Sequence, residues 1–62
     1  MITKEQAKIG TRVEFTAMST GIKYPGTIKA VKGKEIFVAF DDGETGSTFM
    51  DSEASSYSVI EK

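Results

Sequence analysis

The sequence lacks several side chains on which small proteins commonly depend. Its 62 residues include no cysteine, no histidine and no tryptophan, and only one proline. Without cysteine no disulfide can form, and without cysteine or histidine the usual tetrahedral zinc sites are excluded. The absence of histidine also removes the side chain that most often acts as a general base near neutral pH. We therefore expect a protein that is not an enzyme and has no catalytic residues, no cofactor and no metal site.

A long hydrophobic run is missing as well. The N-terminus has no apolar stretch of the signal-peptide kind, and no window approaches the roughly 18 consecutive apolar residues of a membrane-spanning helix. We expect a soluble, cytoplasmic and complete small protein with no membrane partner. Its length allows one domain, residues 1–62, with a core of only a handful of side chains. Such a core depends on close packing, a partner or self-association, so the sequence leaves the oligomeric state open.

The net charge is −1, but the charges are unevenly distributed along the chain. Residues 1–34 contain seven basic and two acidic residues, a net charge of +5, whereas residues 35–62 contain seven acidic residues and one lysine, a net charge of −6. Because phosphate neutralisation supplies most of the affinity of nucleic-acid binders, the near-neutral total argues against a dedicated one. The two halves either mix their charges on interleaved strands or form a basic face and an acidic face.

Five short segments have the patterns of β-strands. In the third of them, Ile36, Val38 and Phe40 alternate with other residues and form an inward-facing row. The Asp-Gly pair at 42–43 is typical of a tight hairpin. The predicted strands span residues 11–16, 24–31, 35–40, 45–50 and 57–60. Their number and spacing predict an all-β fold, a five-stranded SH3-like (Tudor-type) barrel over residues 10–62.

The residues before the first strand favour a short helical turn. Thr3 is suited to an N-cap, Gln6 completes a capping box, and Gly10 is a natural stop. We expect a helical turn within residues 1–9, at about residues 4–8, that is too short to persist unless it docks on the barrel. The candidate docking side chains are Ile2, Ala7 and Ile9.

Finer predictions concern the second strand and the approach to the last one. Pro25 cannot donate a ladder hydrogen bond, so it belongs at the start of a strand or on an edge. Ile28 and Ala30 are expected to face one side, with Val31 out of phase where the strand crosses a barrel corner. Residues 51–56 are small and polar, which favours a 3₁₀ turn.

Two stretches resemble a known family. Residues 21–31, Gly-Ile-Lys-Tyr-Pro-Gly-Thr-Ile-Lys-Ala-Val, resemble the first hairpin of Tudor domains, and residues 36–43, Ile-Phe-Val-Ala-Phe-Asp-Asp-Gly, resemble that family's third strand and turn. Residues 26–31 are also similar to the KOW pattern of transcription and ribosomal factors. The chain is similar, too, to the Tudor-like domains of some bacterial helicases and RNA polymerase-associated proteins. The resemblance covers about residues 9–60 and implies a small barrel that binds a partner.

Tudor domains capture a methylated lysine or arginine in an aromatic cage by cation–π attraction. Position by position, the resemblance places Tyr24 and Phe40 at two cage walls, the loop wall near Ala17 or Met18, and the turn wall near Asp42. Because the last two positions hold no aromatic residue, the resemblance implies at most half a cage. In the alternative interpretation, Tyr24 and Phe40 only cap the open end of the barrel.

The function we expect is that of a protein-interaction module in transcription, DNA repair or phage–host machinery, the setting resting on the resemblance alone. Phe37 lies out of phase with the inward-facing row, so it either packs under the N-terminal helical turn or on the second face of the barrel, or it is exposed as a contact residue. The candidate protein-binding residues are Tyr24, Phe37, Phe40, Met18 and Asp42.

Two other functions stay open. One is weak nucleic-acid binding of the KOW type, against which the acidic turn at residues 41–44 counts. Alternatively, the lysines of the candidate nucleic-acid site form a solvated edge that blocks strand pairing. The other is an obligate self-associating barrel. The candidate nucleic-acid-binding residues are Arg12, Lys23, Lys29, Lys32 and Lys34.

Overall fold

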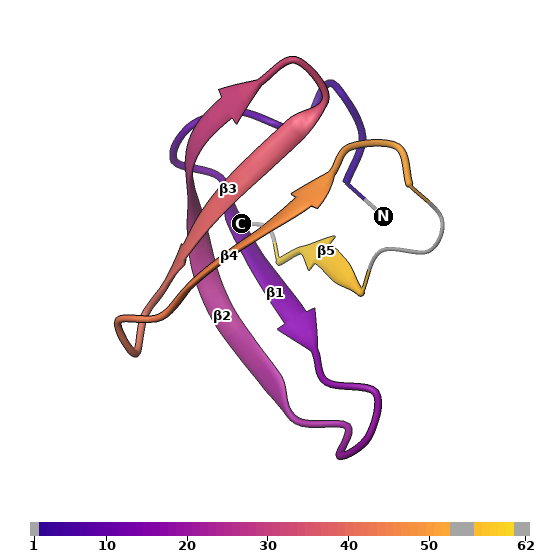
Figure 1. Ribbon diagram of the computed structural model, residues 1–62, viewed down its shortest axis with the longest axis vertical. Helices are drawn as coiled ribbons and strands as arrows, with labels where there is room; N and C mark the ends of the chain where they lie inside the picture. Colours follow the sequence, from indigo (N-terminus) through magenta and orange to yellow (C-terminus); the bar gives the residue numbers. More distant parts are fainter. Residues whose placement is uncertain (1, 53–55, 61–62) are drawn as a thin grey trace.

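The computed structural model describes residues 2–52 and 56–60. Five antiparallel strands form one sheet that curls through 190° into a half-barrel of the SH3-like kind (Figure 1). The strands lie across the sheet in the order β4-β3-β2-β1-β5. Their bounds are β1 (Arg12–Thr16), β2 (Lys23–Lys32), β3 (Glu35–Phe40), β4 (Thr45–Phe49) and β5 (Tyr57–Val59).

The predicted all-β class and the five strands are confirmed. β3 coincides residue for residue with its predicted span, and β2 is longer than predicted by Lys23 at one end and Lys32 at the other. The sheet is a half-barrel and not a closed barrel, because β4 and β5 lie at its two edges. Among the described residues, no helix is long and apolar enough to cross a membrane.

The pairing of β2 with β3 contains an irregularity. The register shifts between Ile28 and Ala30, with Lys29 as the extra residue of a β-bulge. Beyond a bulge, the side chains that face the core change phase. Val31 therefore packs against the core, opposite the buried Ile36 of β3. The expectation that Ile28 and Ala30 share a face is wrong for this reason: Ile28 and Val31 face the core.

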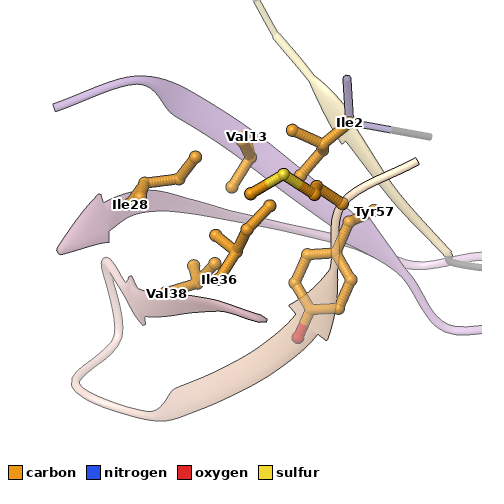
Figure 2. Close-up of a cluster of buried hydrophobic side chains, with 7 residues drawn as sticks. Ile2, Val13, Ile28, Ile36, Val38 and Tyr57 are labelled. Carbon is orange, nitrogen blue, oxygen red and sulfur yellow. The ribbon is translucent and has the colours of Figure 1, made fainter. Parts of the chain in front are cut away.

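The core lies inside the curl of the sheet, where the labelled side chains of Figure 2 point toward one another. Ile2 joins it from the segment before β1, and its carbonyl oxygen accepts the N–H of Asp51 at 2.7 Å. This hydrogen bond holds the N-terminal segment against the turn that follows β4. The buried hydrophobic residues are Ile2, Val13, Ile28, Ile36, Val38, Met50 and Tyr57.

The N-terminal segment forms a turn and not a helix. The N–H of Gln6 donates to the carbonyl of Thr3 at 3.0 Å, and the side-chain oxygen of Gln6 accepts the N–H of Thr3 at 3.0 Å, as one half of a capping box. Ala7 donates in the same way to the carbonyl of Lys4 at 3.3 Å, but the N–H of Lys8 bonds back to Gln6, so no helical ladder develops. Of the expected docking residues, Ile2 is buried and Ala7 packs partly against the core. The prediction that Ile9 docks is wrong, because Ile9 is 72% exposed.

Pro25 lies near the start of β2, as expected. Although β2 is an interior strand, its first residues extend past the end of β3, where Gly26 pairs with Phe40. The carbonyl of Pro25 accepts the N–H of Asp41 at 3.0 Å in the turn beyond β3. The missing N–H of the proline is therefore not needed by the ladder.

The segment after β4 turns into the core at Met50. Met50 is buried, whereas Phe49 is 59% exposed, so Met50 makes the core contact of this strand. Asp51 follows with φ at 59°, in the left-handed region, which ends the extended conformation. The 3₁₀ turn predicted at residues 51–56 includes residues 53–55, which lie outside the described residues.

Candidate functional site

Four aromatic rings gather at one end of the half-barrel. Phe15 of β1 is central: its ring centroid lies 6.4 Å from that of Tyr24, 6.4 Å from that of Phe40 and 5.0 Å from that of Tyr57. The rings of Phe40 and Tyr57 stack with centroids 6.1 Å apart. These separations are those of favourable aromatic pairs. The cluster therefore joins β1, β2, β3 and β5 at a single point.

The register of the sheet brings these rings together. Phe15 lies directly opposite Tyr24 on one side and opposite Tyr57 on the other, and paired residues have their side chains on the same face. The ring of Phe40 packs against two glycines, Gly26 and Gly46. A Cβ on either Gly26 or Gly46 would lie 3.0 Å from an atom of the Phe40 ring, so both positions leave room for that ring.

Three of the rings line a pocket that opens to solvent. The pocket has a volume of about 170 Å³ and is lined by Phe15, Tyr24, Phe40, Asp42 and Glu44. Tyr24 is 37% exposed and forms its outer wall. Tyr57 lies beneath, is buried, and burial raises the pKa of its phenol. We call this site, with its five lining residues, the aromatic pocket.

The two carboxylates of the aromatic pocket come from the turn between β3 and β4. Asp42 accepts the backbone N–H of Glu44 at 3.0 Å, which fixes its side chain in the turn. Gly43 has φ at 97°, the conformation that lets the chain reverse here. Neither Asp42 nor Glu44 forms an ion pair with any other described residue. Both acidic residues thus border the aromatic pocket without an ion-pair partner among the residues that the structure describes.

The neighbouring acid, Asp41, forms an ion pair with Arg12. Its carboxylate accepts two hydrogen bonds from the Arg12 guanidinium, at 2.9 Å and 2.7 Å, and Arg12 also donates to the hydroxyl of Thr27 at 2.8 Å. These hydrogen bonds lower the pKa of Asp41 and raise the pKa of Arg12. The pair ties β1 to the turn after β3, and so it helps to hold the turn that carries the pocket carboxylates.

Of the predicted protein-binding residues, the structure brings three together. Tyr24, Phe40 and Asp42 all line the aromatic pocket. Met18 lies in the loop between β1 and β2 with its side chain 88% exposed. Phe37 is half-buried on the outer face of the sheet, where it borders a second, shallower groove.

Two lining residues were missed from the sequence, Phe15 and Glu44. Phe15 lies in the inward phase of the first strand, and its pairing with Tyr24 depends on how far the loop between the strands shifts the register. Once the register is known, Phe15 supplies a third wall in place of the loop position near Met18. Glu44 lines the pocket because it lies at the end of the hairpin turn that also carries Asp42.

The predicted basic residues do not form one cluster. Lys23 and Lys32 are the first and last residues of β2, so they lie at opposite ends of this long strand. Lys23 forms an ion pair with Glu14 at 3.4 Å, and Arg12 is engaged by Asp41. Lys29 lies at the bulge, and Lys34 lies in the turn between β2 and β3.

The comparisons with known proteins add no relative. No protein-family model matches the chain, and no similar curated protein or solved structure was found. The fold and the geometry of the aromatic pocket therefore carry the functional argument.

Proposed function

We propose that this protein is a non-catalytic interaction module that binds a lysine or arginine side chain of a protein partner in the aromatic pocket. One observation carries the proposal: three aromatic rings line the same small cavity, and two acidic residues that form no ion pair with another described residue, Asp42 and Glu44, border it. A cation over an aromatic face is attracted by the ring quadrupole, and nearby carboxylates add direct charge attraction. An anionic ligand would be repelled by the ring faces and by the nearby carboxylates.

The size of the interaction sets what the partner must provide. Cation–π contacts contribute about 0.5–2 kcal/mol each, depending on how far the cation is desolvated. A pocket of about 170 Å³ holds a single side-chain end and not a folded surface. The affinity for an isolated side chain is therefore low, and specificity comes from the partner surface around it.

The resemblance to Tudor domains supports the same site. The two walls that the resemblance assigns, Tyr24 and Phe40, line the pocket, and Phe15 adds a third ring from a different strand. With three rings, the pocket suits a methylated as well as an unmodified cation, because methylation preserves the charge and increases the apolar contact. The setting in transcription, repair or phage–host machinery rests on the resemblance alone.

The structure does not favour nucleic-acid binding as a second function. Three of the candidate basic residues, Lys23, Lys29 and Lys32, are spread along the length of β2, and two of the five, Arg12 and Lys23, form ion pairs with carboxylates. The aromatic pocket is bordered by two acidic residues, Asp42 and Glu44, whose charge repels phosphate. We therefore propose the protein partner alone.

Capture of partners from a cell lysate tests the proposal. The native chain is compared with Tyr24→Ala, which removes the outer pocket wall, and with Asp42→Asn, which removes one charge. Ile9→Ala is the matched control, since it removes an exposed apolar side chain outside the pocket. We expect both pocket variants to lose a partner that the control retains. Equal recovery by all four proteins would overturn the site.

A further inference from the structure

A second surface, independent of the aromatic pocket, is the free edge of β4. This strand pairs with β3 on one side, and no described strand pairs with its other side. The sheet curls through 190° without closing, so β4 and β5 remain its two edges and do not pair with each other. The edge is therefore available for strand addition.

The usual protections of an edge strand are absent from β4. Natural proteins block such edges with lysine, proline, a bulge or an inward-pointing charge. The sequence of β4, Thr-Gly-Ser-Thr-Phe, contains none of these residues, and its pairing with β3 is regular. By contrast, β5 at the other edge has only three residues.

The backbone groups on this edge alternate in a defined way. The N–H of Phe40 donates to the carbonyl of Glu44 and the N–H of Met50 donates to the carbonyl of Lys34, so even-numbered residues of β4 face β3. The backbone N–H and carbonyl groups of Thr45, Ser47 and Phe49 therefore point to the free edge.

We propose that two copies of this chain associate through antiparallel pairing of their β4 strands, with Ser47 opposite Ser47 at a two-fold axis. In this register Thr45 pairs with Phe49 of the second copy, and all three outward-facing residues of each strand meet hydrogen-bonding partners. The pairing is self-complementary, as a two-fold interface requires.

Charge and shape favour a second copy as the occupant. Residues 45–49 carry no charge, and the register places Glu44 opposite Met50, so no like charges meet across the axis. The outer face beside β4 contains a groove of about 450 Å³ bordered by Phe37, Ala39 and Thr45. Phe49, 59% exposed in the single chain, lies opposite Thr45 of the second copy and covers the rim of that groove.

A charge-swap experiment tests both the association and the register. Ser47→Lys and Ser47→Glu each place like charges face to face at the axis, so each variant alone should associate several-fold more weakly than the native chain in sedimentation. Mixing the two variants should restore association, because residue 47 then faces its opposite charge. Thr45→Lys mixed with Thr45→Glu is the matched control and should show no such restoration, since residue 45 faces residue 49.

A native chain that sediments as a monomer across the concentration range would overturn the proposal. Equal restoration by the Thr45 pair, or association unaffected by either Ser47 variant, would overturn it as well. Because Tyr24 lies on β2, an interior strand that takes no part in the pairing, Tyr24→Ala should leave the association unchanged. Failure of the dimer is thus distinguishable from failure of the proposed binding function.

Discussion

The phenol oxygen of Tyr57, on β5 at one edge of the sheet, lies where a side chain on Gly46 of β4 would begin. A Cβ on Gly46 would approach that oxygen to 2.5 Å, and it would also lie 3.0 Å from the ring of Phe40. The glycine therefore lets the buried tyrosine span the opening between the two edge strands. Tyr57 also packs against Phe15 and Phe40, two of the rings that line the aromatic pocket.

Gly46→Ala should therefore destabilise the fold. The added methyl group forces a buried ring to move, and overpacking of this kind costs about 1–3 kcal/mol in the free energy of unfolding. Thr45→Ser, at the adjacent exposed position, should change the free energy of unfolding by no more than about 0.5 kcal/mol. Denaturant titration of both variants measures the difference. Equal stability of Gly46→Ala and the native chain would contradict the described packing.

Ile2 should matter far more than Ile9, although both precede the first strand. Ile2 is buried in the core, whereas Ile9 is 72% exposed. Ile2→Ala should lower the free energy of unfolding by about 2–5 kcal/mol, the usual cost of such a core truncation. Ile9→Ala should stay within about 0.5 kcal/mol of the native value. Similar losses in both variants would show that the N-terminal segment docks differently.

The ion pair between Arg12 and Asp41 should make the free energy of unfolding depend on pH in the acidic range. Folding lowers the pKa of Asp41 below its ordinary value of 3.8, chiefly through the hydrogen bonds from Arg12. The stabilisation is therefore complete above the unfolded pKa and is lost as the pH falls through the lower, folded pKa. Unfolding measured from neutral pH to strong acid should reveal this loss in the native chain and its absence in Arg12→Gln.

Lys23→Gln is the matched control for that comparison. It removes the other ion pair, with Glu14, and leaves the pair at Asp41 intact. Its acid-dependent loss of stability should follow that of the native chain in the window set by Asp41. If Arg12→Gln and the native chain lose stability in parallel, the pair does not stabilise the fold.

Tyr57 should titrate above its ordinary value in the folded protein. Burial raises the pKa of its phenol above 10.0, because the charged form is poorly solvated there. Folding thus favours the neutral form, and this stabilisation is present below the unfolded pKa and lost as the pH rises through the folded pKa. In Tyr24→Phe, Tyr57 is the only tyrosine, so the ultraviolet absorbance of the phenolate reports it alone. Identical midpoints with and without denaturant would contradict its burial.

Much of the fold follows from the sequence because its strands are short, regularly spaced and bounded by turn residues. The row formed by Ile36, Val38 and Phe40 defined β3 correctly, since alternation determines which face is buried. The bulge at Lys29 has no comparable signal: one extra residue depends on the pairing of two strands, and it reversed the expected orientation of Ala30.

The aromatic pocket was predictable only in part. Tyr24 and Phe40 were identified through a family resemblance, and Asp42 through its turn. Phe15 was not, because its place beside Tyr24 is a long-range consequence of the register between β1 and β2. Met18 does not line the aromatic pocket, since it is 88% exposed in the loop between β1 and β2, and its role in partner binding stays a prediction.

Titration of the isotope-labelled protein with a short peptide, followed by nuclear magnetic resonance, tests the central claim most directly. The peptide carries one lysine, one trimethyl-lysine or one arginine in an otherwise uncharged sequence. We predict saturable shifts at Tyr24, Phe40 and Glu44, with affinity weakened roughly 2- to 30-fold in Tyr24→Ala, equivalent to about 0.5–2 kcal/mol. Shifts that do not saturate, or that fall elsewhere on the protein, would contradict the aromatic pocket as a cation-binding site.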